Sequence, residues 1–182
     1  MANVLIVHGI FGSSKENWFP WLKRELEKLG HSVLVPDFPS PDKPRLKKWL
    51  AKLEEFPGFL DGNSIVVGHS LGVTFLLSVL EKQKAKAAFF VAGFAQSPGN
   101  AFDTEMKTFT EREFDWSSIR KNCGSFHIFH SDNDPYVPLE KAELIAENLG
   151  TSVIVVKGAG HFNAEAGYTE FGLLLEGIKK EI

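Results

Sequence analysis

The sequence predicts an α/β fold in three layers, with helices on both faces of a parallel sheet of about six strands. Along all 182 residues, short apolar runs alternate with stretches of helical periodicity. Each run is continuously apolar rather than alternating in polarity, which is typical of strands buried on both faces. No linker, repeat or low-complexity segment interrupts this order, so we expect one domain over residues 1–182, without a separate lid domain.

The six apolar runs that we expect to form strands are spread along the whole chain. They are Val4–Val7, Ser32–Val35, Ile65–Val67, Ala87–Val91, Ser125–Phe129 and Ser152–Val156. The first helix should begin near Asn17, because a start at Ser13 would place Pro20 in the helix interior. Residues 9–16 are therefore predicted to form an extended loop, although Ser13 and Glu16 have the spacing of a capping box.

The helices in the middle of the chain differ in their expected burial. Asp42 is the candidate cap of the second helix. Its buried face should consist of Leu46, Trp49, Leu50 and Leu53. The third helix, Val73–Leu80, is apolar nearly all round, as expected for a helix packed deep against the sheet. The stretch Gly93–Trp116 has no clear period, which is typical of a lid or a pocket wall, and only Thr104–Thr110 within it is predicted to be helical.

Two further helices follow the fifth and sixth strands. The first of them should end at Gly150. It is expected to bury Ala142, Ile145, Ala146 and Leu149. The last helix is expected to carry Phe171, Leu174, Leu175, Ile178 and Ile182 on one side.

Composition and charge argue against several classes of function. The net charge of −3 offers no basic surface for nucleic acid or for an anionic membrane. No apolar run approaches the length of a membrane span, and the start of the chain lacks the basic residues and long apolar run of a signal peptide. Because Cys123 is the only cysteine, no internal disulfide can form. We therefore expect a cytoplasmic protein.

The most informative stretch is Gly68-His69-Ser70-Leu71-Gly72, a G-x-S-x-G pattern between a predicted strand and a predicted helix. A strand that turns directly into a helix through one strained residue lifts that side chain above the sheet, and the flanking glycines permit a close approach. Ser70 is therefore a candidate nucleophile. The same turn aims the backbone N–H of Leu71 at the space beside Ser70, where an oxyanion would need stabilisation.

Two further polar groups follow predicted strands, Asp134 after the fifth and His161 after the sixth. Loops at the carboxyl ends of parallel strands converge on one edge of the sheet, so these groups should meet Ser70. A serine hydroxyl needs a base to accept its proton; imidazole suits that role, and a carboxylate can hold its tautomer. We therefore predict Ser70, Asp134 and His161 as nucleophile, orienting acid and base, with Asp132 as a competing carboxylate.

Neighbouring residues would complete this site. The backbone N–H of Ile10, or as second choice that of Phe11, would form the oxyanion hole together with Leu71. Candidate walls of an apolar substrate pocket are Phe11, Trp18, Phe94 and Phe162. His127 and His130 lie three apart on a predicted strand and so point to opposite faces. We therefore expect no metal site, and no cofactor is needed.

Several of these motifs together resemble the α/β-hydrolase superfamily. They are Val-His-Gly-Ile-Phe-Gly at 7–12, Gly-His-Ser-Leu-Gly at 68–72, Asp-Pro-Tyr-Val-Pro at 134–138 and Gly-His-Phe at 160–162. The small size, with Trp-Phe-Pro-Trp-Leu at 18–22 and Ser-Asp-Asn-Asp-Pro at 131–135, is similar to the compact lidless branch typified by retinoblastoma-binding protein nine and its bacterial relatives. The resemblance covers nearly the whole chain. It implies the same triad, and it favours Asp134 over Asp132 because the family motif places the acid directly before the Pro-x-Val-Pro turn.

One feature of that branch is missing. The vertebrate member is named for a Leu-x-Cys-x-Glu segment that binds retinoblastoma protein, whereas this chain has Phe59-Leu60-Asp61-Gly62-Asn63 in that region. We therefore do not expect retinoblastoma protein as a partner.

The sequence thus predicts a serine hydrolase that cleaves carboxylic esters, or small amides, through an acyl-enzyme on Ser70. Phosphate binding by the glycine-rich first loop is one alternative, but Gly9–Gly12 lacks the Walker spacing. A non-catalytic protein- or ligand-binding module on a hydrolase scaffold is the other. The presence of all three candidate residues in the expected chain order argues against it.

Overall fold

The computed structural model describes residues 1–182, which fold around one six-stranded sheet. The strands are β1 (Asn3–Val7), β2 (Ser32–Leu34), β3 (Ile65–His69), β4 (Ala85–Val91), β5 (Cys123–Ser131) and β6 (Val153–Val156). Their order in the sheet is β2-β1-β3-β4-β5-β6, and every pairing is parallel. The carboxyl ends of all six strands therefore lie at one edge of the sheet. The predicted α/β class with a parallel sheet is confirmed.

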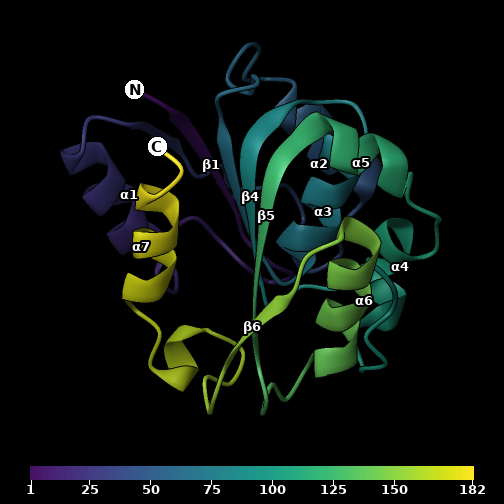
Figure 1. Ribbon diagram of the computed structural model, residues 1–182. Coiled ribbons are helices and arrows are strands. Elements are labelled where there is room, and N and C mark those ends of the chain that lie inside the picture. The colour runs from purple at the N-terminus through teal and green to yellow at the C-terminus, as the bar shows by residue number, and fades with distance from the viewer.

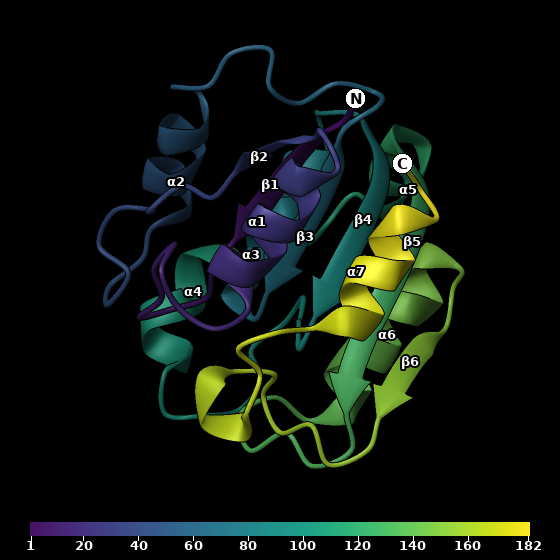
Figure 2. The same cartoon turned by 90° about the vertical axis from the view of Figure 1, so that its left-hand side faces the viewer.

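Helices cover both faces of this sheet. They are α1 (Phe19–Lys28), α2 (Leu46–Leu53), α3 (Leu71–Leu80), α4 (Asp103–Thr110), α5 (Trp116–Asn122), α6 (Leu139–Leu149) and α7 (Gly172–Lys179), with a 3₁₀ helix η1 at Ala164–Ala166. Figure 1 shows α1 and α7 on one face and α2 to α6 on the other. Figure 2 gives a view onto the first face, where α1 and α7 cover the sheet. None of the helices combines the length and the apolar character needed to cross a bilayer.

The sheet separates two apolar cores, and α3 lies at the centre of the larger one. All ten residues of α3 are buried. The helix packs against β1, β3 and β4 on one side and against α2, α4 and α5 on the other. This double packing explains why its sequence is apolar nearly all round, and the predicted deep burial is confirmed.

The two ends of the chain lie at the same edge of the sheet, opposite the carboxyl ends of the strands (Figure 1). Strand β1 begins only two residues after Met1. At the other end, the carboxylate of Glu181 accepts a hydrogen bond from Ser125 Oγ at 3.0 Å and pairs with His127 Nε2 at 2.7 Å. Ser125 and His127 are the third and fifth of the nine residues of β5, so the end of the chain is anchored between the amino end and the middle of that strand.

The loop before α1 follows the prediction. Residues 9–16 contain no helix or strand, and α1 begins at Phe19 with Pro20 in its first turn. The carboxylate of Glu16 accepts the N–H of Ser13. One of the two bonds of a capping box therefore forms here within a loop, without a helix behind it.

The start of α2 differs from the prediction. The helix begins at Leu46 with Arg45 as its cap, and Asp42 plays no part. The reason is Pro44, which keeps the residue before it away from the helical conformation. The N–H of Leu46 donates instead to Thr108 Oγ1 on α4 at 3.1 Å. A residue distant in sequence thus supplies the cap.

The stretch 93–116 contains α4 where a helix was expected, but the sequence analysis missed α5. This helix has Asp115 as its cap, whose side chain accepts the N–H of Ser118 at 3.0 Å. The signal was present in the sequence, because an aspartate at the N-cap position can accept the backbone N–H of the third helical residue. Because α5 has only seven residues, it is too short to show the helical periodicity by which longer helices are found.

The expectation that every strand is buried on both faces is wrong for β6. This strand lies at the edge of the sheet, and Ile154 and Val155 are 40% and 45% exposed. A continuous apolar run indicates a parallel strand but does not say how many neighbours that strand has.

Candidate active site

Ser70 lies in a strained turn between β3 and α3. Its φ of 56° and ψ of −121° are unfavourable for any residue with a side chain. Its N–H donates to Val91 O on β4 at 2.9 Å, which fixes the turn to the sheet. Close approach requires glycines nearby: a Cβ on Gly72 would lie 2.4 Å from Val7 O, and one on Gly9 would lie 3.0 Å from Ser70 Cβ. The strained strand-to-helix turn predicted from the G-x-S-x-G pattern is present.

Ser70 and His161 both line a cavity of about 390 Å³ at the carboxyl edge of the sheet. The cavity walls come from the loop after β1, the start of α1, the stretch before and within α4, and the loops after β5 and β6. Phe11 and Phe94, both predicted as pocket residues, are part of these walls. Lining residues that the sequence analysis did not single out include Phe102, Met106 and Tyr136.

Trp18 and Phe162 do not line the cavity, which corrects the prediction for these two residues. Both side chains are fully buried in the core beneath α1 and α7. Trp18 Nε1 donates to Phe162 O at 3.0 Å, so the two residues join the start of α1 to the loop after β6. At the edge of a sheet an aromatic side chain can face either the cavity or the core, and residue type alone does not distinguish the two.

The side chains of Asp134 and His161 are in direct contact. His161 Nδ1 lies 2.8 Å from Asp134 Oδ2, and the other carboxylate oxygen accepts the N–H groups of Tyr136 and Val137 at 2.9 and 3.0 Å. Burial alone would raise the pKa of the Asp134 carboxyl, but the hydrogen bonds from His161 and these backbone groups outweigh it, so the pKa is lowered. An ionised carboxylate at this place keeps the proton on Nδ1 and leaves Nε2 free to accept one.

Asp132, the competing carboxylate, lies elsewhere. Its side chain is exposed, and its Oδ1 accepts the N–H of Gly158 at 2.8 Å. It makes no hydrogen bond or ion pair with His161. Of the two carboxylates, the structure brings only Asp134 to the imidazole.

Ser70 Oγ makes no hydrogen bond with His161 in this structure, although both residues line the same cavity. Contacts between a nucleophile and its base are often long without substrate and tighten when substrate binds. The hydroxyl of Ser70 and the imidazole of His161 therefore face one cavity, but they are not hydrogen-bonded to each other.

The backbone N–H groups near Ser70 distinguish between the two candidate oxyanion donors. The N–H of Phe11 donates to Pro41 O at 2.7 Å and is therefore engaged. The N–H of Ile10 makes no hydrogen bond with the protein. The N–H of Leu71, at the first position of α3, has no acceptor within its own helix. The two free donors are thus the first-choice pair from the sequence.

Two other histidines in these motifs are buried and neutral. Burial, reinforced by the nearby His161, lowers the pKa of His69 to about 3, and its Nε2 donates to His161 O at 2.8 Å. Burial also lowers the pKa of His8, whose Nε2 accepts the N–H of Phe38 at 3.0 Å while Nδ1 donates to Gly9 O. Both rings have their polar contacts within the protein, which fits orienting roles rather than the role of a base.

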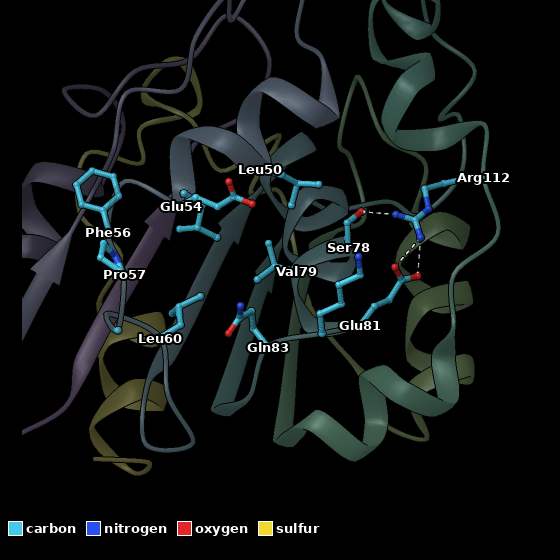
Figure 3. Close-up of a pocket in the computed structure, with 13 residues that line it drawn as sticks. Leu50, Glu54, Phe56, Pro57, Leu60, Ser78, Val79, Glu81, Gln83 and Arg112 are labelled. Atoms are coloured by element: carbon cyan, nitrogen blue, oxygen red, sulfur yellow. Dashed lines mark hydrogen bonds and ion pairs between the residues drawn. The ribbon is translucent and has the colours of Figure 1, made fainter.

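A larger cavity of about 530 Å³ lies at the opposite end of α3, and none of the predicted catalytic residues lines it. Figure 3 shows its walls, formed by the ends of α2 and α3 and by the loop that contains Phe56, Pro57 and Leu60. Arg112 closes one side by donating to both carboxylate oxygens of Glu81, at 2.7 and 2.6 Å, and to Ser78 Oγ at 3.1 Å. Size alone would select this cavity, but the candidate chemical groups converge in the smaller one.

Comparisons with known proteins cover nearly the whole chain. The family model described as serine hydrolase matches residues 4–179. The YdeN protein of Bacillus subtilis (strain 168) is 30% identical over 177 residues, which are 95% of this chain and 92% of that protein. The crystal structure of the B. subtilis ydeN gene product has a TM-score of 0.93 at 29% identity, with 100% of this chain and 98% of that chain covered.

Two further proteins extend the comparison. The serine hydrolase RBBP9 of Rattus norvegicus is 26% identical over 181 residues, which are 98% of this chain and 94% of that protein. The structure of an esterase domain from a Rhodothermus marinus protein has a TM-score of 0.69 at 17% identity, with 97% of this chain and 84% of that chain covered. At that identity the likeness concerns the fold alone.

Proposed function

The chain belongs to the serine hydrolase family, and from this premise we propose that it cleaves carboxylic esters through an acyl-enzyme on Ser70. The observation that carries the proposal is the 2.8 Å contact between Asp134 and His161 at the cavity that Ser70 lines. The family assignment confirms the resemblance inferred from the motifs, and the residues below are our proposal for how this member acts.

In the first half of the reaction, Ser70 Oγ attacks the carbonyl carbon of the ester while His161 Nε2 takes the hydroxyl proton. Asp134 holds the imidazole in the required tautomer and stabilises the imidazolium. The negative charge that develops on the carbonyl oxygen is stabilised by the N–H groups of Leu71 and Ile10. When the C–O bond breaks, His161 returns the proton to the departing alcohol and leaves the acyl group on Ser70.

In the second half, a water molecule attacks the acyl-enzyme. His161 takes one proton from the water, and a second tetrahedral intermediate forms in the same oxyanion hole. Its collapse releases the carboxylic acid and returns the proton to Ser70 Oγ. The same residues would cleave a small amide. In that reaction His161 would give its proton to the departing amine instead of to an alcohol.

The cavity indicates a small-molecule substrate. A volume of about 390 Å³ is within the range of sites that enclose small organic ligands. Its walls combine aromatic side chains, such as Phe11 and Phe102, with polar groups such as Asn100 and Asn163. We therefore expect short or aromatic acyl groups rather than long acyl chains.

Labelling with a fluorophosphonate probe tests the proposal, because the probe reacts only with an activated serine. The wild type should label and should hydrolyse short p-nitrophenyl esters. Ser70→Ala should lose labelling, and its kcat should fall by about 10⁶-fold. The melting temperature of the variant serves as the control for folding.

Undiminished turnover by folded Ser70→Ala would refute the proposed mechanism. A wild type that neither reacts with the probe nor hydrolyses the short p-nitrophenyl esters would favour the binding-module alternative.

A further inference from the structure

The loops that follow β5 and β6 are joined by a row of side-chain hydrogen bonds. Ser131 Oγ accepts the N–H of Ala159 at 3.0 Å. Asp132 Oδ1 accepts the N–H of Gly158 at 2.8 Å, and Asn133 Oδ1 accepts the N–H of Gly160 at 2.8 Å. The next residue, Asp134, contacts His161 at 2.8 Å. Each of four consecutive residues, 131–134, is therefore bonded to one of four consecutive residues, 158–161.

The segment 158–161 needs such support. Gly158 and Gly160 have positive φ angles of 69° and 55°, and glycine loses more conformational freedom on ordering than any other residue. The strand before this segment, β6, has a partner on one side only. His69 Nε2 holds the carbonyl of His161, and the side-chain bonds from the loop after β5 hold the N–H groups of the three residues before it.

Asn133 has the central place in this row. Its Oδ1 accepts the N–H of Gly160, directly before His161, and also the hydroxyl of Ser131 at 2.6 Å. Ser131 is 1% exposed, so its hydroxyl depends on Asn133 for an acceptor. Asn133 does not line the cavity. It can therefore affect the reaction only through the residues that it holds.

We propose that Asn133 is a positioning residue for the base: by holding the N–H of Gly160, it places the His161 imidazole between Asp134 and Ser70. The inference rests on the proposed function, since it assigns the base role to His161. Misplacing a catalytic group by about 1 Å can cost on the order of 100-fold in rate. A small loop shift at Gly160 is therefore enough to be measured in kcat.

The test compares Asn133→Leu with Asn133→Asp. The leucine side chain branches as asparagine does but has no acceptor, so kcat should fall about 10- to 100-fold with KM unchanged. The aspartate keeps an acceptor oxygen, so most of kcat should return above neutral pH. Its added negative charge near the base should move the acidic limb of the pH–rate profile to higher pH.

Asp132→Ala is the matched control, because it also removes one side-chain bond to a backbone N–H of the same loop. Its bond is to Gly158, two residues farther from His161 than that of Asn133. A role in positioning predicts that Asp132→Ala costs several-fold less kcat than Asn133→Leu. A merely structural role predicts that both variants lose activity only in proportion to the fraction unfolded.

A proton NMR spectrum provides a readout that does not require turnover. The Nδ1–H proton of His161, hydrogen-bonded to Asp134, should give a downfield resonance in the wild type and in Asn133→Asp. It should be weakened or shifted in Asn133→Leu. If Asn133→Leu does not fold, Asn133→Ser replaces it, because the shorter side chain also loses the bond to Gly160.

A folded Asn133→Leu protein with wild-type kcat and an unchanged resonance would overturn the inference, and so would an equal loss of kcat in Asp132→Ala. These outcomes differ from a failure of the proposed function, which Ser70→Ala assayed alongside would reveal by retaining turnover.

Discussion

Backbone strain in this protein is concentrated around one cavity. The non-glycine residues with positive φ are Phe11, Asn17, Ser40, Ser70, Ala92 and Phe162. Phe11, Asn17 and Ser70 line the cavity. Phe162 directly follows the candidate base in the sequence. Such conformations persist only where the surrounding structure holds them. For Ser70 that support is visible as the hydrogen bond to Val91 and the glycines packed against the turn.

The two neighbouring carboxylates provide the sharpest comparison at the residue scale. In Asp134→Asn the new amide group would donate a hydrogen bond to His161 Nδ1 and so select the wrong tautomer. We expect kcat to fall by about 10⁴-fold. Asp132→Asn keeps an oxygen for the N–H of Gly158, so kcat should change by less than about threefold, within the range of surface substitutions. Steady-state kinetics on one ester at pH 8 give both values, and equal losses would mean that the orienting acid is misassigned.

The buried ring of His69 makes the stability of the protein depend on pH. In the folded protein the pKa of His69 is about 3, whereas an unfolded histidine has a pKa near 6.5. Between these values unfolding binds a proton, so the free energy of unfolding decreases as the pH falls. From pH 7 to pH 5 this residue should contribute a loss of about 2 kcal/mol. The lowered pKa values of His8 and His130 act in the same direction.

Urea denaturation at pH 7 and pH 5 measures this effect. His69→Gln, which has no titrating group, should show a pH dependence smaller by about 2 kcal/mol than that of the wild type. An identical pH dependence in the two proteins would show that His69 is protonated in the folded state at pH 5.

At the scale of elements, the close approach of α3 to β1 depends on a single missing side chain. A Cβ on Gly72 would lie 2.4 Å from Val7 O and 2.8 Å from His8 O, and these backbone atoms belong to or directly follow a central strand. Gly72→Ala should therefore lower the free energy of unfolding by about 3 kcal/mol, the upper part of the range for overpacked cores. Urea denaturation provides the measurement.

Gly172→Ala is the control for this substitution. Gly172 is the first residue of α7, and a Cβ there would meet no atom within 4 Å. The change should leave stability unchanged or raise it by up to about 1 kcal/mol, because alanine favours a helix more than glycine does. A destabilisation equal to that of Gly72→Ala would contradict the packing argument.

The elements that could be predicted are those whose own residues determine them. The apolar content of α3 and the Gly150 stop of α6 are local signals, and both elements lie where expected. The start of α2 depends partly on a distant residue, because the N–H of Leu46 is held by Thr108 on α4. The exposure of β6 depends on its place at the sheet edge, which an apolar run does not encode.

The same distinction applies to the candidate site. The positions of Ser70, Asp134 and His161 follow from loops that must converge at one edge of a parallel sheet. Which aromatic residues face the cavity depends instead on side-chain directions in irregular loops. Trp18, predicted as a pocket wall, is a core residue for this reason. In the sequence, Asn133 is only one residue of the Ser-Asp-Asn-Asp-Pro motif. Its role as acceptor for the N–H of Gly160 follows from the structure alone.

For the molecule as a whole, the charge of the cavity should influence the choice of substrate. Glu16 and Glu165 line the cavity, and no Lys or Arg does. Esters with an anionic acyl group should therefore be poor substrates. The neutral substrate is p-nitrophenyl butyrate, and the anionic one is the mono-p-nitrophenyl ester of succinate, which keeps one free carboxylate. At low ionic strength, kcat/KM for the neutral ester should exceed that for the anionic ester by about tenfold or more. The ratio should decrease as salt screens the carboxylates.

Glu165→Gln is the matched variant for this prediction, because the exposed glutamate sits on η1, just after the candidate base. Removing its charge should narrow the ratio between the neutral and the anionic ester, while kcat for the neutral ester stays unchanged. If kcat/KM in the wild type is nearly equal for the two esters, or if their ratio does not change with salt, the proposed effect of the cavity charge is wrong.

The position of the chain ends has a practical consequence. Residues near both ends lie at the amino edge of the sheet (Figure 1), with Glu181 anchored to Ser125 and His127 of β5. The residues that line the cavity lie at the carboxyl edge. A resin, a fluorescent protein or an electrode surface coupled at either end would hold the molecule with its cavity facing outward. Attachment by its ends should therefore yield an immobilised catalyst in which each molecule presents its reactive edge to the flowing substrate.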